Sequence, residues 1–435
     1  MKLWYLVVGV LVGLVASAAV ALAGGGPRTE LVSRANNGDP ASGGSSTPGG
    51  ITPNTRWVAF DSDADNLPGA STTYNQVYVR DRKTGKTKLV SRTNGGVPAD
   101  GGSSYDPTIS DDGRFVGFES YATNLPGSIG PTYYQAYVRD LKKGKTILVS
   151  RLSGGDPASG GNSEDASISA NGRLVAFESE ATNLPGGTGT YFQTYLRDRK
   201  TGTTKLISKT NGGTPGDSDS DDPAISPNGG IVGFESDASN LPGATGDTQI
   251  YVRDVKGGKT KLVSANNAGD PGDADSQDVT VSGNGRFAEF ESYATNLPGS
   301  LGPTYTQVYV RDRKTRKTSL ISRTSGGDPA TGGYSENASI SSNGNFVEFE
   351  SGATNLPGAG GMHDLVYLRD RDKGKTTLVS KSNSGNPADD SSYTRKNSRL
   401  ISADPRFATF YSYATNLPGA IGPTYSQAYV RGPSP

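Results

Sequence analysis

The chain has 435 residues, of which 32% are hydrophobic, 60 are glycine and 26 are proline. So low an apolar share argues against long buried helices and predicts short, repeated apolar stripes of the kind found in β-structure. The absence of cysteine excludes disulfides, cysteine-ligated zinc and thiolate catalysis, and a single histidine, His363, argues against histidine-rich metal sites. The 43 basic and 43 acidic residues balance, so we expect no specific nucleic-acid partner.

The first residues carry the features of an export signal. Lys2 precedes a nearly unbroken apolar run over 3–20, and Ala21-Leu22-Ala23 follows as a small-x-small cleavage pattern. We therefore expect a signal peptide over 1–23, a linker over 24–28 and an exported protein that is secreted, cell-wall associated or periplasmic. The alternative is an uncleaved N-terminal membrane anchor on an extracytoplasmic protein, because about 20 apolar residues just span a bilayer.

After residue 27 one pattern is written seven times. A phenylalanine that closes a Val-x-Phe type run marks each unit, at spacings of 58, 59, 57, 56, 59 and 61 residues. The markers are Phe60, Phe118, Phe177, Phe234, Phe290, Phe349 and Phe410. A period near 60, with four short apolar runs per unit and no helical pattern, is typical of a four-stranded propeller blade.

The second unit illustrates the four expected strands. We place an inner strand at 107–110, a second at 114–120, a third at 135–140 and an outer strand at 146–150. Asp112-Gly113, and Asn-Gly in other units, predict a two-residue hairpin turn, because such turns need positive φ. A long loop over 121–134 joins the second and third strands, and a second long loop leads from the outer strand into the next unit.

The two ends of the repeat array complement one another. Residues 29–33 are a lone copy of the outer strand, whereas the seventh unit stops after its third strand near Arg431. Pairing these two strands would close a ring and cover two sheet edges that otherwise favour aggregation. The sequence therefore predicts an all-β, seven-bladed β-propeller over 29–435, with four-stranded antiparallel blades and an N-terminal strand that completes the last blade.

These units resemble a known repeat family. The run Pro227-Asn228-Gly229, the Val-x-Phe strand, 250–254 and 262–264 are similar to TolB-type, WD-repeat-like propeller repeats of exported bacterial proteins. The resemblance covers essentially all of residues 28–435. It implies an extracytoplasmic binding or scaffold protein and brings no catalytic residues with it.

The two long connections of every unit should lie on one face of the ring, here called the long-loop face, and the hairpin turns on the opposite, short-turn face. Long loops on a rigid scaffold usually carry binding. Each long loop contains Asn-Leu-Pro-Gly, and we expect the asparagines to brace it through backbone hydrogen bonds rather than to bind a ligand. They are Asn66, Asn124, Asn183, Asn240, Asn296, Asn355 and Asn416.

Aromatic residues follow that segment unevenly, which favours a directional binding site. They pack between blades, or they present flat faces to sugars or to a protein partner. The candidate binding residues are Tyr74, Tyr133, Tyr134, Tyr191, Phe192, Tyr305 and Tyr425, with His363 in the sixth unit.

Acidic residues cluster in the loops that lead from outer to inner strands. Alternating aspartates can wrap calcium, although these runs lack the glycine and the twelfth-position glutamate of an EF-hand. We therefore expect solvated turns, with calcium as a weaker alternative and no other cofactor. The candidate ligands are Asp217, Asp219, Asp221, Asp273 and Asp275.

The turns of the short-turn face are basic. Such a rim could attach weakly to anionic wall polymer or lipid, or it could be ordinary solubilising charge. Its members are Arg82, Lys83, Lys142, Lys143, Arg313, Lys314, Arg316 and Lys317.

Two further columns of charge recur around the ring. Carboxylates end the second strands and arginines end the third strands, and we expect the two columns to tie blades together as hydrogen-bonded charge pairs. The carboxylates are Asp61, Glu119, Glu178, Glu235, Glu291 and Glu350, and the arginines are Arg80, Arg139, Arg197, Arg253, Arg311, Arg369 and Arg431.

No catalytic constellation is confined to one or two units, so we assign no catalytic residue and expect no enzyme. The expected function is a secreted, non-catalytic binding or scaffold propeller that engages a protein or a cell-envelope glycan through the long-loop face. The alternative is a carbohydrate-active lyase or hydrolase, since propellers support such chemistry.

Overall fold

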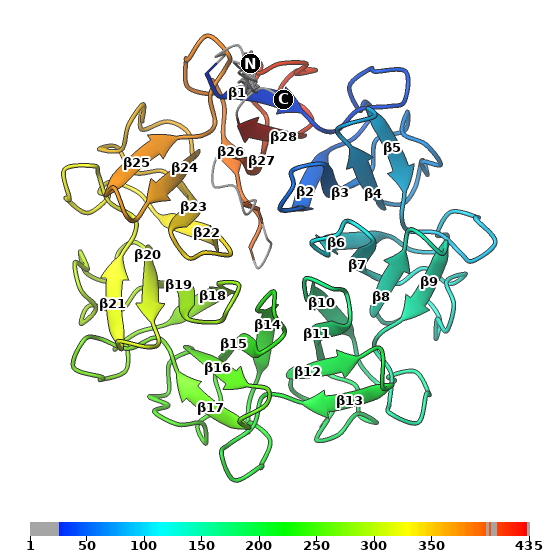
Figure 1. Cartoon of the computed structure of the whole chain (residues 1–435), viewed down its shortest axis with the longest axis horizontal. Coiled ribbons are helices and arrows are strands. Elements are labelled where there is room, and N and C mark those ends of the chain that lie inside the picture. Colours follow the sequence, from blue (N-terminus) through cyan, green and yellow to red (C-terminus); the bar gives the residue numbers. More distant parts are fainter. Residues whose placement is uncertain (1–25, 397–399, 402–406, 433–435) are drawn as a thin grey trace, which may run out of the picture.

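A computed structural model describes residues 26–396, 400–401 and 407–432. The described residues form seven four-stranded antiparallel sheets arranged as a closed ring, as Figure 1 shows. The sequence prediction of a seven-bladed β-propeller is therefore confirmed. The expected signal peptide and residues 24–25 of the expected linker lie outside the described residues, and none of the described segments is a helix long and apolar enough to cross a membrane.

The strands fall into four concentric sets. The inner strands are β2 (Ser46–Ile51), β6 (Ser104–Ile109), β10 (Ser163–Ile168), β14 (Ser220–Ile225), β18 (Ser276–Val281), β22 (Ser335–Ile340) and β26 (Ser392–Tyr393). The second strands are β3 (Trp57–Ser62), β7 (Phe115–Ser120), β11 (Leu174–Ser179), β15 (Ile231–Ser236), β19 (Phe287–Ser292), β23 (Phe346–Ser351) and β27 (Ala408–Ser412).

The third strands are β4 (Gln76–Asp81), β8 (Gln135–Asp140), β12 (Gln193–Asp198), β16 (Gln249–Asp254), β20 (Gln307–Asp312), β24 (Leu365–Asp370) and β28 (Gln427–Gly432). The outer strands are β5 (Lys86–Leu89), β9 (Lys145–Leu148), β13 (Thr203–Leu206), β17 (Lys259–Leu262), β21 (Lys317–Leu320), β25 (Lys375–Leu378) and β1 (Arg28–Leu31). Blades are numbered here by their inner strands, so that blade 1 contains β2 and blade 7 contains β26.

The ring closes through its two ends. Strand β1 pairs antiparallel with β28, so that Thr29 lies opposite Arg431. The Arg431 Nη1 atom donates to Thr29 Oγ1 at 2.7 Å. Leu31 and Val32 are buried in the cores on either side of this sheet. The predicted closure is confirmed.

Each blade has the same aromatic centre. The marker phenylalanine of the second strand stacks on a tyrosine of the third strand, with ring centroids 5.5 to 5.8 Å apart. In blade 2 the pair is Phe118 and Tyr137, both fully buried. Stacked aromatic pairs of this kind add about 0.5–1.5 kcal/mol to their area burial. The repeat therefore buries one large aromatic pair per blade despite its low apolar content.

The inner strands differ from the prediction in two ways. Strand β6 begins at Ser104, three residues before the expected start, because the chain passes through a β-bulge between Tyr105 and Thr108. The following hairpin is not a two-residue turn, because Ser110 N donates to Phe115 O and Gly113 N to Ser110 O around a four-residue loop. Only Gly113 there has positive φ, at 69°, whereas a two-residue type I′ turn needs two such residues.

Blade 7 departs from the other six. Its inner strand β26 covers two residues only, and pairing with the second strand resumes as an isolated bridge between Ile401 and Ala408. Between these points the chain carries Arg395 and Lys396, whose side chains form ion pairs with Asp61, Asp106 and Asp222 of blades 1, 2 and 4. The segment brings two cations into the central channel.

Candidate functional site

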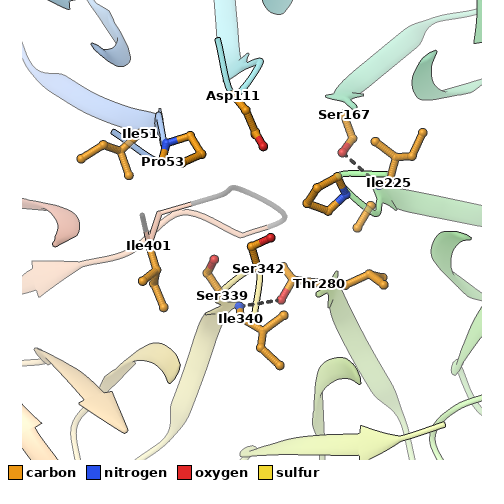
Figure 2. Close-up of a pocket in the computed structure, with 13 residues that line it drawn as sticks. Ile51, Pro53, Asp111, Ser167, Ile225, Thr280, Ser339, Ile340, Ser342 and Ile401 are labelled. Carbon is orange, nitrogen blue, oxygen red and sulfur yellow. Dashed lines mark hydrogen bonds between the residues drawn. The ribbon is translucent and has the colours of Figure 1, made fainter. Parts of the chain in front are cut away.

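The inner strands run along the central channel from the long-loop face to the short-turn face. Inner strands end there, and Ile51, Ile225, Ile340 and Ile401 line a cavity of about 40 Å³, shown in Figure 2. A space of this size holds about one water molecule.

Carboxylates of blades 2 to 5 gather at the inner strands, nearer the long-loop face. Three overlapping groups each bring three carboxylate oxygens within 4.8 Å of one another. We call these side chains the acidic belt, and its members are Asp106, Glu119, Asp165, Glu178, Asp222, Glu235 and Asp278.

The aspartates of the acidic belt are placed by the bulge of each inner strand. Asp106, Asp165, Asp222 and Asp278 all have positive φ, between 46° and 51°. Few residues other than glycine adopt this conformation, and aspartate and asparagine are enriched among those that do. The bulge thus turns the aspartate out of the sheet register and toward the neighbouring blade.

The glutamates of the acidic belt tie each blade to the next. Glu178 Oε2 accepts a hydrogen bond from Asp222 N at 2.6 Å, and Glu235 Oε2 accepts one from Asp278 N at 2.8 Å. Glu119 Oε2 accepts from Asp165 N at 3.1 Å. The predicted link between blades is correct, but the partner is a backbone amide of the next blade rather than an arginine.

The arginine column links neighbouring blades as expected, but through hydroxyl and carbonyl oxygens rather than through carboxylates. Arg139 Nη1 donates to Thr146 Oγ1 in its own blade and to Arg92 O in the loop of the preceding blade. The other arginines of the column make the same threonine contact, as in Arg369 with Thr376. These side chains lie toward the outer strands, so the two columns do not form charge pairs with one another.

Burial and mutual repulsion disfavour the charged form of the acidic belt. Burial, with Asp222 and Asp278 nearby, raises the pKa of Glu235 to about 9. Burial, followed by Asp222, raises the pKa of Asp278 to about 7. The same causes raise the pKa of Glu119 and Glu178 well above the usual range. A cationic side chain placed among these carboxylates would therefore stabilise their charged form.

Arg395 and Lys396 supply two positive charges to this channel. Arg395 forms an ion pair with the buried Asp61, and its Nε lies 3.2 Å from Asp106 Oδ1. Lys396 Nζ lies 3.0 Å from Asp222 Oδ2. Although burial disfavours the charge of Lys396, the surrounding aspartates raise its pKa. Blade 7 therefore neutralises part of the belt from within.

The predicted aromatic residues lie in the long-loop connections, and two of them pack against a further tyrosine. Tyr134 packs edge-to-face on Tyr121 at 4.5 Å, and Tyr305 packs in the same way on Tyr334 at 5.1 Å. Tyr334 is 45% exposed and Tyr425 is 36% exposed. The remaining four are half-buried, namely Tyr74, Tyr133, Tyr191 and Phe192.

Several tyrosines that the sequence analysis did not select complete these clusters. Tyr393 of blade 7 contacts both Tyr411, at 5.4 Å, and Tyr413, at 6.5 Å. Tyr121 and Tyr334 are the partners of selected residues. They lie before the Asn-Leu-Pro-Gly segment or at an inner strand. The predicted aromatic residues all follow that segment, so its position did not indicate these tyrosines.

His363 lies on the surface of the long-loop connection of blade 6. Its side chain is 34% exposed, and its Nδ1 atom lies 3.6 Å from Asp390 Oδ1. The adjacent Asp364 is a second acidic neighbour; burial raises the pKa of its carboxyl, and the charge of His363 acts to lower it.

Four of the five aspartates considered for calcium accept hydrogen bonds from the loops. Asp217 accepts hydrogen bonds from Ser239 N and Oγ, and Asp273 makes the equivalent contacts to Thr295. Asp219 and Asp275 accept from the backbone amides of Phe192 and Thr248. Asp221 lies beside the belt, and burial raises its pKa to about 7. Among the described residues, none of these five belongs to the three carboxylate groups of the belt.

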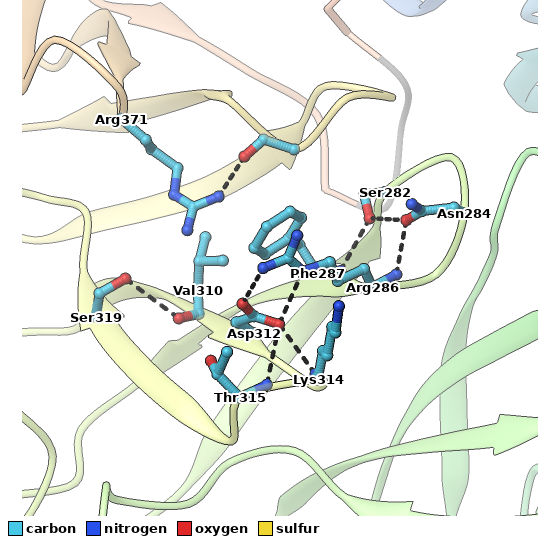
Figure 3. A network of polar contacts seen from close by, with 11 residues as sticks. Ser282, Asn284, Arg286, Phe287, Val310, Asp312, Lys314, Thr315, Ser319 and Arg371 are labelled. Atoms are coloured by element: carbon cyan, nitrogen blue, oxygen red, sulfur yellow. Dashed lines mark hydrogen bonds and ion pairs between the residues drawn. The ribbon is translucent and has the colours of Figure 1, made fainter.

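The basic rim is partly structural. The Arg82 side chain is 9% exposed and pairs with Glu30 at 2.7 Å, and Arg313 donates to Gly285 O. Figure 3 shows two contacts of similar kind in blade 5. Arg286 donates two hydrogen bonds to the Asp312 carboxylate, and Arg371 of the next blade lies 4.6 Å from the centroid of the Phe287 ring. The exposed members are Lys83, Lys142, Lys143, Lys314, Arg316 and Lys317.

The sequence contains a signal for the belt. Inner-strand segments begin with Ser-x-Asp in four units, at 104–106, 163–165, 220–222 and 276–278, and with Ser-x-Asn at 335–337. The longest spacing between markers, 61 residues, precedes Phe410 and contains Arg395 and Lys396. An aspartate column on inner strands, together with one lengthened unit, would have indicated the channel.

No protein-family model and no curated protein matches the chain. TolB from Acinetobacter baumannii is 17% identical with a TM-score of 0.43, and the match covers 79% of this chain and 65% of that one, which is less than two thirds. The putative TolB from Agrobacterium tumefaciens is 17% identical with a TM-score of 0.45, over 91% of this chain and 100% of that chain.

A third solved structure reaches a higher TM-score. The β-propeller domain of the trilobed protease from Pyrococcus furiosus has a TM-score of 0.52 at 11% identity, over 89% of this chain and 97% of that chain. It is described as having an open velcro topology, whereas here β1 completes the sheet of blade 7. At this identity the likeness shows a shared propeller fold.

Proposed function

We propose that the chain is an exported, non-catalytic binding propeller of the TolB type. Its long-loop face would engage a protein or a cell-envelope glycan. The apolar N-terminal segment supports export, and the repeat residues support the TolB-type assignment. The propeller fold suits a binding or scaffold role, because it holds many loops rigidly on one face.

The observation that carries this proposal is the arrangement of tyrosines in the long-loop connections. Tyr305 and Tyr334 of neighbouring blades form an edge-to-face pair, and Tyr334 and Tyr425 expose 45% and 36% of their surface. Exposed tyrosines offer flat apolar area and a hydroxyl at a low entropic cost, which suits sugar rings and protein surfaces alike.

The acidic belt argues for binding rather than hydrolysis. Glycoside hydrolysis by two carboxylates needs one acid and one base with different roles on either side of a bond. Here Glu119, Glu178 and Glu235 all accept a hydrogen bond from the next blade's backbone, so they share one supporting role.

The test compares two surface variants of the full chain. The triple variant Tyr305→Ala, Tyr334→Ala and Tyr425→Ala removes the exposed rings, and the matched control, Lys83→Ala, Lys143→Ala and Lys317→Ala, alters the short-turn face. Binding to protease-treated envelope glycan, and photo-crosslinking from position 425 to intact envelopes, examine the glycan and protein arms separately. We expect the tyrosine variant to lose at least about tenfold in affinity in one arm, since buried aromatic anchors dominate interfaces.

Equal binding by the tyrosine variant and the unaltered chain in both arms would contradict the assignment of the face. Release of sugar fragments from an acidic polysaccharide, abolished by His363→Ala, would contradict the non-catalytic role and favour the carbohydrate-active alternative. The lysine control also reports on attachment through the basic rim, which about 0.5 M salt should abolish by screening.

A further inference from the structure

A groove on the short-turn face lies between blades 1 and 2, beside the outer strands. It measures about 650 Å³, within the range of sites that hold small ligands. Trp57 and Leu89 of blade 1 and Leu141 of blade 2 form its apolar part. Of the described residues, five basic side chains line it, against one acidic side chain, Asp112. We call it the Trp57 groove.

Blade 2 lacks an arginine that covers this position in other blades. The first residue after the third strand donates its backbone amide to the residue before the second strand, as Leu141 N does to Arg114 O. In blades 1, 3 and 6 that residue is an arginine, and its guanidinium carbon lies 4.5 to 5.4 Å from an aromatic ring of the preceding blade, in the pairs Arg82–Phe407, Arg199–Phe115 and Arg371–Phe287. Leu141 is too short to cover the ring of Trp57 in this way, so both side chains border the groove.

Trp57 is held in place by its neighbours. A Cβ atom placed on Gly113 would lie 2.3 Å from Trp57 Cδ1, so the hairpin of blade 2 packs closely on the edge of the indole. The Arg56 guanidinium carbon lies 4.8 Å and Lys88 Nζ lies 5.6 Å from the ring centroid. A half-buried indole fixed in this way offers a ligand a flat apolar surface at low entropic cost.

The positive charge of the groove is only partly neutralised. Arg56 and Arg114 are paired with aspartates of their own blades. Asp112 accepts hydrogen bonds from Ser110 Oγ and Arg114 N within its own turn. The other three basic side chains form no ion pair with a described residue, namely Lys88, Arg92 and Lys142. The groove therefore favours an anionic ligand.

Arg92 differs from the arginines at the same position of other blades. Three equivalents donate to the carbonyl oxygen of the glycine four residues later, in the pairs Arg34–Gly38, Arg151–Gly155 and Arg323–Gly327. The Arg92 guanidinium donates no hydrogen bond to a described residue, and its Nε atom is buried. The Nε atoms of Arg151 and Arg323 also lack a partner, but each of these guanidiniums uses Nη2. A buried donor without an acceptor is costly, so an external acceptor would be favoured at Arg92.

We propose that the Trp57 groove binds an acidic polysaccharide, with the C–H face of one sugar ring on Trp57 and uronate carboxylates on Arg92 and Lys88. A sugar ring has an apolar face and a polar edge, which match an indole bordered by cations. A guanidinium also presents two parallel N–H donors to a carboxylate. Single-stranded nucleic acid is a poorer match, because it uses successive aromatic platforms and one aromatic side chain of the described residues lines this groove.

A second groove, between blades 3 and 4, offers a matched control. It measures about 510 Å³, and Val255 stands there at the position of Leu141. Lys205 lines it and is the equivalent of Lys88, since the two pair with Leu196 and Val79 at the same register of their blades. Of the described residues, no aromatic side chain lines this second groove. It therefore carries similar charge without a stacking ring.

The experiment titrates the full chain by calorimetry with short galacturonate oligomers and with the matched neutral galactose oligomers. We expect the galacturonates to bind with a dissociation constant below about 1 mM, and the neutral oligomers to bind at least about tenfold more weakly. Trp57→Leu, which copies Leu174 of blade 3, and Arg92→Gln should each weaken galacturonate binding at least about tenfold. Lys205→Ala should leave it unchanged.

Leu141→Arg separates a shaped groove from a patch of charge. The substitution copies Arg199 and Arg371, so the fold accepts it, and the guanidinium should cover Trp57 as those arginines cover their phenylalanines. We expect binding to weaken at least about tenfold although the chain gains a positive charge. Equal or tighter binding would overturn the proposal, because charge alone would then hold the polymer.

Thermal unfolding checks that each variant is folded. The proposal is also overturned if galacturonate and galactose oligomers bind equally, or if Trp57→Leu and Lys205→Ala weaken binding equally. Tighter binding of a single-stranded oligonucleotide or of anionic lipid vesicles, lost in the same variants, would assign the groove to another ligand and overturn it. The triple tyrosine variant of the long-loop face should bind galacturonate normally, and a loss there would place the sugar on the other face.

Discussion

Glu350 illustrates how a single buried carboxyl couples the stability of this propeller to pH. Its side chain is 4% exposed, and burial raises its pKa to about 8, against the hydrogen bonds that it accepts from Asn337 and Thr394. Glu336, Tyr393 and Tyr411 are the titratable groups around it. Between its ordinary pKa and about 8, the folded chain holds a proton that the unfolded chain has released.

This difference predicts the sign of the pH dependence. The contribution of Glu350 is fully present below its unfolded pKa and is lost as the pH rises through its folded pKa, so the free energy of unfolding should fall between about pH 4.5 and pH 8. Glu350→Gln keeps an acceptor for Thr394 N but no longer titrates. We expect the slope of unfolding free energy against pH to become shallower by up to about 1.4 kcal/mol per pH unit.

Denaturant unfolding at several pH values measures both slopes. Glu180→Gln serves as the control, because Glu180 lies in a loop at the belt's edge and is more exposed. Identical slopes in Glu350→Gln and the unaltered chain would mean that Glu350 is ionised when folded.

At the residue scale the sequence predicted local roles well and non-local roles poorly. The asparagines of the long loops act as expected, since Asn66 Oδ1 accepts from Ser42 N at 3.0 Å and Asn66 Nδ2 donates to Pro40 O. The carboxylate column was correctly expected to link blades, but its glutamates accept from backbone amides, and Asp61 pairs with Arg395 rather than with the arginine column. The hydrogen bond from a backbone amide of the next blade could not be predicted, because the two residues are far apart in the sequence and any residue type can supply the amide.

At the element scale, the segment of blade 7 between β26 and β27 stands out. Arg395 is held by the buried Asp61 of blade 1 and by Asp106 of blade 2, so one side chain joins three blades. The Asp61 side chain is 5% exposed. Burial alone would strongly disfavour its charge, and Arg395 opposes that effect.

Removing this arginine should destabilise the ring. Arg395→Ala leaves Asp61 buried without its counter-charge, and breaking a buried pair from one side typically costs about 3–5 kcal/mol. The double variant Asp61→Asn and Arg395→Ala should recover most of that loss, because the uncompensated charge is gone. Denaturant unfolding of the single and double variants measures both effects.

A double variant no more stable than Arg395→Ala would contradict this explanation, since the loss would then come from packing of the segment rather than from charge. Asp61→Asn alone completes the cycle and isolates the coupling between the two side chains.

Elements were predictable where the repeat is regular. The third strand at 135–140 matches β8, because its hydrophobic alternation is uninterrupted. The inner strands were placed too short, since the bulge breaks the two-residue period that identifies a strand. In blade 7 the longer spacing before Phe410 is the sequence feature that marks the segment with Arg395 and Lys396.

At the scale of the whole molecule, closure through β1 is the feature on which the ring depends. Deleting residues 28–33 would expose Leu31 and Val32, which are 1% and 0% exposed, and would leave β28 as an open edge. Burial of two such side chains contributes about 3–6 kcal/mol. We expect a lower unfolding midpoint and self-association through the free edge.

Thermal unfolding and size-exclusion chromatography measure these two effects. A chain shortened only through residue 26 is the control, because it retains β1. An unchanged midpoint after deletion of 28–33 would contradict the role assigned to this strand.

The overall architecture was predictable because several independent features indicate the same ring. The marker phenylalanine and the Asn-Leu-Pro-Gly segment each occur seven times, and the first and last strands complement one another. For the candidate site, the sequence predicted which face of the ring carries the long loops but not the carboxylates inside the channel. Its acidic interior arises where seven inner strands converge, and that convergence exists only after the ring has formed.

The pairing of β1 with β28 also constrains the order of events during folding. Thr29 and Arg431, which share a hydrogen bond, are separated by 402 positions in the chain. Contacts of such long range form late and slowly, because a very large loop must close first. During synthesis the first strand would stay unpaired until the seventh blade had been made. Early folding intermediates should therefore be incomplete rings with an unpaired strand that can associate with other chains.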